Sequence, residues 1–155
     1  MSSKGKPAEA LPTNVLLVED SSGDVRLMRE ALREANSHVV LNVVSDGVEA
    51  MQFLRLEGDY ANAPRPDLIL LDLNLPKIDG RKVLALIKGD EQLKTIPTLV
   101  LTTSQSEADI VMCYQLQANC FLNKPVQLEE FYELVGSISD YWLNRVSLPH
   151  RRRTG

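Results

Sequence analysis

The sequence predicts an α/β fold with one parallel sheet, and three observations indicate it. Five short apolar segments alternate with amphipathic segments along the 155 residues. The densest of them, residues 67–76 (DLILLDLNLP), lacks the polar alternation of a half-exposed strand. Such a run is typical of a strand buried on both faces of a parallel sheet. Turn residues at Asp79 and Gly80 then separate it from the next helical pattern.

Composition narrows the class of protein. The length is about that of one domain, and contents of 44% hydrophobic and 25% charged residues are ordinary for a globular protein. A net charge of −4 argues against a general nucleic-acid binder. No apolar run approaches transmembrane length, and the N-terminus leads into no signal segment. With Cys113 and Cys120 expected to be buried and reduced, we expect a cytoplasmic protein.

The first third of the chain contains two predicted strands and two predicted helices. Residues 1–13 are aperiodic and rich in Ser, Lys and Pro, so they predict a flexible arm. A strand over 14–18 is followed by a helix with Ser21 as N-cap, and Asp24 is expected to reach back to Ser21 in a capping box. One face of that helix is apolar through Val25, Met28, Ala31, Leu32 and Ala35.

The remaining elements follow the same pattern. The second strand is predicted over 38–44, and a helix starts near Gly47 with Ala50, Met51 and Leu54 facing inward. A long polar loop, 57–66, precedes the central apolar strand. The later predicted elements are a helix from Gly80 or Arg81 to Gly89, a strand over 98–101, a helix over 106–117, a strand over 120–122 and a last helix over 128–144.

This alternation implies right-handed crossovers and a sheet covered by helices on both faces. The matching topology is the flavodoxin-like (βα)5 three-layer sandwich with strand order 2-1-3-4-5, in one domain over 14–144 with a tail over 145–155. Strands one and three are neighbours in that order. We therefore expect Glu19, Asp20 and Asp72, which follow those two strands, to converge.

A cluster of carboxylates repels itself unless a hard cation neutralises it, and Mg²⁺ is the cation that fits best. The ends of the fourth and fifth strands add a hydroxyl at Thr102 and a cation at Lys124. Carboxylates, a hydroxyl and a lysine around one point suit a phosphoryl group. Asp72 is the candidate nucleophile that carries it.

Together these residues resemble the response-regulator receiver domain, the CheY-like family. The resemblance rests on Glu19-Asp20, Asp72, Thr102 and Lys124-Pro125, each at its own strand end, and covers nearly the whole chain. It implies a two-component phosphorelay in which Asp72 accepts a phosphoryl group from a phosphohistidine of a sensor histidine kinase. Asp20 and Asp72 would bind Mg²⁺ directly and Glu19 through water.

The resemblance assigns further roles. The backbone carbonyl of Asn74 would be a third protein ligand of the metal. Thr102 and Lys124 would each contact a phosphoryl oxygen, and Phe121 would turn inward with the threonine as an aromatic switch. The family often has Tyr at that position, so Phe121 keeps the packing change but lacks the hydroxyl.

A narrower resemblance is to the single-domain response regulators of cyanobacterial phytochromes. It rests on the 57–66 loop, the turn at 76–80 (PKIDG) and the Trp142-Leu143 end of the last helix. It implies a phytochrome-like partner kinase and a homodimer through the fourth helix, fifth strand, fifth helix and C-terminal extension. The wide apolar arc of the last helix agrees, and we expect Phe131, Tyr141 and Trp142 in that interface.

Other functions fit the pattern less well. A phosphatase of the haloacid-dehalogenase type also uses a strand-end aspartate with Mg²⁺, but it wants a second aspartate where this chain has Asn74. A flavin carrier would need a phosphate-binding loop where this chain has Glu19 and Asp20. We therefore expect a signalling module that is not an enzyme and acts through protein contacts. The run Arg151–Arg153 is expected to be a solvated tail, with no DNA or membrane partner.

Overall fold

The computed structural model describes residues 12–35 and 37–149, and it confirms the predicted α/β fold. All strand pairs are parallel, and the sheet order is β2-β1-β3-β4-β5. The strands are β1 (Thr13–Val18), β2 (Val39–Val44), β3 (Leu68–Leu71), β4 (Thr98–Thr102) and β5 (Cys120–Asn123). The helices are α1 (Ser22–Glu34), α2 (Gly47–Arg55), α3 (Gly80–Lys88), α4 (Glu107–Gln115) and α5 (Leu128–Ile138), with shorter turns η2 (Gly58–Tyr60) and η3 (Ser139–Leu143).

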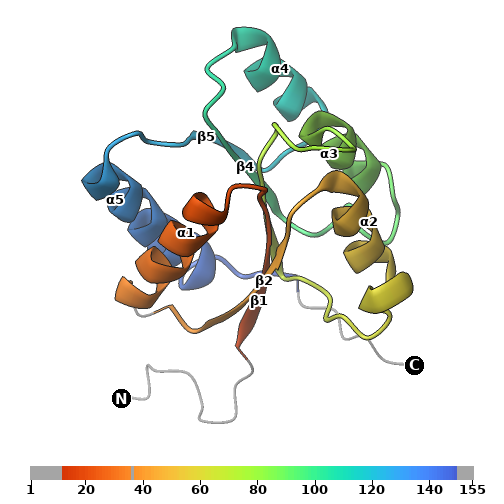
Figure 1. Ribbon diagram of the computed structural model, residues 1–155, viewed down its shortest axis with the longest axis horizontal. Helices are drawn as coiled ribbons and strands as arrows, with labels where there is room; N and C mark the ends of the chain where they lie inside the picture. The colour runs from red at the N-terminus through yellow and green to blue at the C-terminus, as the bar shows by residue number, and fades with distance from the viewer. Residues whose placement is uncertain (1–11, 36, 150–155) are drawn as a thin grey trace.

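Helices cover both faces of the sheet, which makes three layers (Figure 1). α1 and α5 lie on one face, and α2, α3 and α4 lie on the other. Alternate residues of each central strand enter the two cores: Leu68 and Leu70 pack with α1 and α5, whereas Ile69 and Leu71 pack with the other three helices. Every residue of β3 is therefore buried, which explains its unbroken apolar sequence.

Most differences from the predicted elements are shifts of one or two residues at their ends. β1 begins at Thr13 rather than at residue 14, because the Thr13 N–H donates to the carbonyl of His38 at 3.2 Å and extends the ladder. The 57–66 loop contains η2, where the ring of Tyr60 packs on Phe53 with centroids 5.3 Å apart. The predicted arm lies, up to residue 11, outside the described residues, as does the run Arg151–Arg153.

The last helix differs more clearly. A continuous α-helix to Asn144 is wrong, because α5 ends at Ile138 and a single π-helical turn, η3, carries the chain on to Leu143. In η3 the hydroxyl of Ser139 is buried and lies 2.5 Å from the hydroxyl of Ser37. A hydrophobic pattern over one turn cannot distinguish the two helix types.

The segment after β3 is held close to its neighbours by two glycines. A Cβ on Gly80 would overlap the backbone carbonyl of Asp72, and a Cβ on Gly47 would overlap Ile78. The Gly80 N–H donates to the carbonyl of Leu73 at 2.8 Å. The path of the chain that leaves Asp72 is thus fixed by backbone contacts that only glycine permits.

Two further sequence expectations concern the thiols and the membrane. Cys113 and Cys120 are free thiols; Cys113 is buried and Cys120 is half-buried. Within residues 12–35 and 37–149, no helix combines the length and the apolar character needed to cross a bilayer.

Replacement of Gly80 by Ala should destabilise the protein by about 3 kcal/mol, because the new Cβ meets backbone atoms that cannot move independently. Gly136 is the matched control: it also lies in a helix, but a Cβ there meets nothing within 4 Å. Gly136→Ala should stabilise the fold by about 0.5–1 kcal/mol. Urea unfolding measures both, and equal effects would contradict the assigned close approach.

Candidate functional site

The polar residues expected at the strand ends do lie together at one edge of the sheet. Asp72 directly follows β3, and its N–H donates to the carbonyl of Val18 at 3.1 Å, so the ends of β3 and β1 lie side by side. Lys124 directly follows β5, and its N–H donates to the carbonyl of Thr102 at 2.7 Å. The parallel ladders thus align all four strand ends.

The three predicted metal ligands meet at this edge. One carboxylate oxygen from each of Glu19, Asp20 and Asp72 lies within 4.8 Å of the others. Glu19 and Asp72 are buried, with exposed fractions of 5% and 7%, whereas Asp20 is exposed at the rim. The predicted convergence of these acids is therefore confirmed. Three hard oxygen donors at this spacing fit a divalent cation, since such ions bind carboxylate oxygens and keep several waters.

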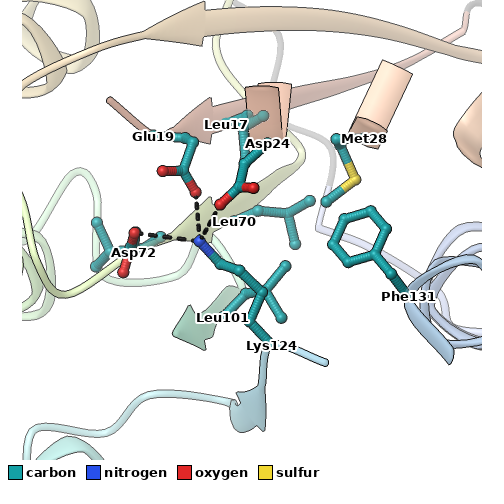
Figure 2. A pocket seen from close by; sticks show the side chains of 10 residues that line it. Leu17, Glu19, Asp24, Met28, Leu70, Asp72, Leu101, Lys124 and Phe131 are labelled. Carbon is teal, nitrogen blue, oxygen red and sulfur yellow. Dashed lines mark hydrogen bonds and ion pairs between the residues drawn. The ribbon is translucent and has the colours of Figure 1, made fainter. Parts of the chain in front are cut away.

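Lys124 lies at the centre of the acids, as Figure 2 shows. Its Nζ is 2.8 Å from Oε1 of Glu19 and 2.9 Å from Oδ2 of Asp24. A third distance, 3.3 Å, joins Nζ to Oδ2 of Asp72. Only 8% of the lysine side chain is exposed. Each of its three ammonium protons can thus be directed at a carboxylate in a site largely shielded from water.

Burial and the neighbouring charges both shift the pKa values of Lys124 and Glu19. Burial alone would lower the pKa of Lys124, but its hydrogen bonds to Glu19 and Asp24 and the nearby carboxylate charges outweigh that effect and raise the pKa. Burial raises the pKa of Glu19, and the charge of Asp72 adds to the rise, against the lowering effect of Lys124. The pKa of Glu19 is therefore raised because the effect of burial exceeds that of the ammonium.

Asp24 is a member of the site that the sequence did not predict. Its N–H does donate to Ser21 Oγ at 3.2 Å, which confirms Ser21 as the N-cap of α1. The second half of the expected capping box is wrong: the Ser21 N–H donates to Glu19 Oε2 at 3.2 Å, and the Asp24 carboxylate pairs with Lys124. The available signal was an acid in the first turn of a helix that starts at the functional edge of the sheet.

The other predicted residues surround the cluster. Thr102 is fully buried, and its Oγ1 accepts a hydrogen bond from the Ser104 N–H at 3.3 Å. The Asn74 N–H donates to Asp72 Oδ1 at 3.2 Å, while the Asn74 side chain is exposed. Phe121 is half-buried against the core under α4, and its N–H donates to the hydroxyl of Tyr114 at 3.2 Å.

The residues expected in a dimer interface separate into two groups. Phe131 is only 3% exposed and packs in the core between α5 and the sheet, so it is not a surface residue and the expectation for it is wrong. It is the inward residue of an amphipathic helix whose outward side carries Leu128, 56% exposed. Tyr141 is 57% exposed and stacks edge-to-face with the half-buried Trp142, with centroids 5.8 Å apart.

A second charged network lies beside the acids, between α3 and α4. Arg81 donates from Nε and Nη2 to the two carboxylate oxygens of Asp109 at 2.8 and 2.7 Å, a bidentate pair. Ser104 Oγ also donates to Asp109, at 2.7 Å, and the Asn123 side-chain amide donates to the Ser104 carbonyl at 2.8 Å. The loop that follows Thr102 is therefore tied to α3, α4 and β5.

Comparison with known proteins agrees with this geometry. The family model described as the response regulator receiver domain matches residues 15–136. The chain belongs to the response-regulator receiver family. It is 49% identical to the response regulator Rcp1 of Synechocystis sp. over 138 residues, which cover 89% of this chain and 94% of Rcp1.

Solved structures of two family members are also similar to this one. The Mn²⁺-bound form of response regulator Rcp1 matches with a TM-score of 0.86 and 49% identity, over 90% of this chain and all (100%) of that chain. The phosphorylated cyanobacterial phytochrome response regulator RcpA matches with a TM-score of 0.86 and 50% identity, over 90% and 99%. The protein is thus a receiver-type response regulator similar to those of phytochrome signalling, and the comparisons give no support to a phosphatase.

The pair between Arg81 and Asp109 predicts a pH dependence of stability. Hydrogen bonds from Arg81, and then from Ser104, lower the pKa of Asp109 from 3.8 to about 2. Because the folded pKa lies below the unfolded one, the stabilisation is fully present above about pH 4 and is lost as the pH falls toward 2. Asp109→Asn should cost about 1–2 kcal/mol at pH 7 and flatten the unfolding free energy over that window.

Urea unfolding at several pH values measures this effect. The control is Glu91→Gln, which removes an exposed acid paired with Lys94 at 3.1 Å and should change the stability by less than about 0.5 kcal/mol. An acid limb that is as steep in Asp109→Asn as in the wild-type protein would contradict the role assigned to Asp109.

Proposed function

We propose that Asp72 is the phosphoacceptor of this response regulator and that the phosphoryl group comes from a phosphohistidine of a sensor histidine kinase. The observation that supports this is the position of Asp72: its carboxylate lies within 4.8 Å of those of Glu19 and Asp20 and 3.3 Å from the ammonium of Lys124. A carboxylate in this setting is held against a cation and next to a potential metal site, at the edge of a parallel sheet where ligands bind.

The chemistry is a transfer between two nucleophiles. A carboxylate oxygen of Asp72 forms a bond to phosphorus as the phosphorus–nitrogen bond of the phosphohistidine breaks. The imidazole nitrogen leaves with the electron pair and takes up a proton. Lys124 would pair with one phosphoryl oxygen, and the hydroxyl of Thr102, which accepts from the Ser104 N–H, would donate its own proton to another. The expected output is a protein contact, so we propose a signalling role rather than an enzymatic one.

We propose Mg²⁺ as the cation, held by Asp20 and Asp72 directly, by Glu19 through water and by the backbone carbonyl of Asn74. An all-oxygen set with few protein ligands suits this ion, and Mn²⁺, which occupies a solved structure of Rcp1, has similar preferences. The bound cation would neutralise charge on the incoming phosphoryl group.

We further propose that Thr102 and Phe121 carry the signal outward. Thr102 lies at the end of β4, and Phe121 lies on β5 in register with Val100. Since Phe121 is only half-buried and packs against the core under α4, a change in its position would alter the surface formed by α4 and β5. The receiver domain would occupy residues 14–144, with an arm before it and a tail after it.

We propose that the partner kinase is of the phytochrome type. The protein would then act in the cytoplasm, where such kinases are phosphorylated. The similarity to Rcp1 and to RcpA, a cyanobacterial phytochrome response regulator, supports this. A homodimer through α4, β5, α5 and the C-terminal extension is also proposed. The exposed Tyr141 and the exposed Val111 and Tyr114 of α4 are apolar surface that such a contact would cover.

Asp72→Asn should abolish labelling by acetyl phosphate in the presence of Mg²⁺, because the amide oxygen is a poor nucleophile. Intact-protein mass spectrometry would record the gain of one phosphoryl group in the wild-type protein and none in the variant. Asp59→Asn, an exposed acid in η2, should be labelled like the wild type. Persistent labelling of Asp72→Asn would rule out Asp72 as the acceptor, and labelling unchanged by a chelator would rule out the metal.

Replacement of Tyr141 and Trp142 by Ser and Gln should convert a dimer into a monomer, because it removes the aromatic pair from the end of the last helix. Sedimentation velocity at micromolar concentration measures the change. Leu56→Gln, which alters an exposed apolar residue after α2, is the control and should leave the mass unchanged. A wild-type protein that sediments as a monomer at all concentrations would remove the dimer proposal.

A further inference from the structure

Asp24 has a different relation to the cluster from the other acids that bind Lys124. Glu19 and Asp72 contact the ammonium and also belong to the three acids that could hold a metal ion. Asp24 contacts the ammonium at 2.9 Å and is not part of that group. The lysine and a divalent cation would therefore compete for two carboxylates, while the third is available to the lysine alone.

That competition matters because Lys124 is buried. A cation held by Asp72 directly and by Glu19 through water would draw on the charge of both acids and would repel the ammonium. An ammonium that is 8% exposed and loses its partners is strongly destabilised, since water cannot replace them. The metal and the lysine can occupy the pocket together only if the lysine keeps a carboxylate of its own.

We propose that Asp24 is a positioning residue that retains Lys124 when a divalent cation takes Glu19 and Asp72. The inference rests on the proposed function of the pocket as a metal-assisted phosphoacceptor site. It assigns a role to a residue of α1 that touches neither the metal group nor Asp72 and acts through Lys124. Asp24 keeps the ammonium beside the acceptor, ready to pair with a phosphoryl oxygen, and thereby lowers the cost of binding the metal.

The placement of Asp24 suits this role. Its backbone is fixed in the first turn of α1 by the bond from its N–H to Ser21 Oγ, and the next residue, Val25, donates to the Ser21 carbonyl at 3.0 Å. Its side chain is 34% exposed, so it stands at the rim of the pocket rather than in its floor. Figure 2 shows its carboxylate beside that of Glu19 above the ammonium, with Asp72 to the left. The ammonium is thus within reach of the proposed acceptor and of Asp24 at the same time.

Titration of the whole protein with Mn²⁺ by calorimetry tests the proposal without measuring phosphorylation. Asp24→Asn should bind Mn²⁺ about five- to tenfold more weakly than the wild type. Asp24→Glu, which keeps the carboxylate, should restore most of the affinity. Glu34→Gln removes the same charge from the exposed far end of α1 and should change the affinity less than about twofold.

A second pair of variants separates action through Lys124 from a general charge effect. In a Lys124→Met background there is no ammonium to hold, so Asp24→Asn should there change the Mn²⁺ affinity less than about twofold. An equal loss with and without the lysine would overturn the proposal, as would wild-type affinity in Asp24→Asn. A wild-type protein that does not bind Mn²⁺ at all would instead overturn the proposed function, and this inference with it.

Discussion

The ammonium of Lys124 is the contact on which the arrangement of the functional edge depends. It joins the element ends that carry Glu19, Asp24 and Asp72, from β1, α1 and β3, to the end of β5. Three carboxylates contact this ammonium, and a fourth, that of Asp20, lies within 4.8 Å of those of Glu19 and Asp72. A group of buried acids without a cation would destabilise the fold. Lys124 therefore stabilises the folded protein, whatever part it takes in the chemistry of the site. The acids outnumber this ammonium, so the proposed binding of a dianionic phosphoryl group would be helped by a further cation.

The sheet supplies the precision that such a cluster requires. β3 is buried along its whole length, and its register with β1 fixes how far Asp72 projects beyond the edge. Beyond Asp72 the chain turns against the start of α2, where Gly47 and Gly80 allow backbone to approach backbone. Asp46 supports that turn: it is buried, caps α2 through the Glu49 N–H at 2.8 Å and lies 3.5 Å from Lys77, whose φ of 69° is in the left-handed region. Asp72 is thus held by backbone contacts of its own strand and of the loop that follows it.

Much of this could be predicted from the sequence because it depends on short-range patterns. The unbroken apolar run of β3 and the alternation of strands and helices determine a parallel sheet, and a parallel sheet brings Glu19, Asp20, Asp72, Thr102 and Lys124 to one edge. The features that could not be predicted depend on which of several possible partners a side chain contacts in the folded protein. Asp24 has the spacing of a capping residue, yet its carboxylate bonds a lysine a hundred residues away in sequence. Phe131 has the apolar character of an interface residue, and only the position of α5 over the sheet reveals that it faces the core.

The hydrogen bonds around Thr102 indicate how a change of charge at Asp72 can reach the surface. The Thr102 hydroxyl accepts from Ser104, Ser104 donates to Asp109, and Asp109 is held by Arg81. The Thr102 hydroxyl can donate to a group on Asp72 while it accepts from Ser104, and a shift of Thr102 toward Asp72 would draw on the loop that carries Ser104 and its bond to Asp109. The bidentate pair with Arg81 is the strongest of these, so such a shift would affect first the Ser104 contact and the Asn123 amide that holds the same loop. The Ser104 contact ties the loop after β4 to α4, and the Asn123 amide ties the same loop to β5, so a rearrangement there would act next to the exposed side chains Val111 and Tyr114 of α4.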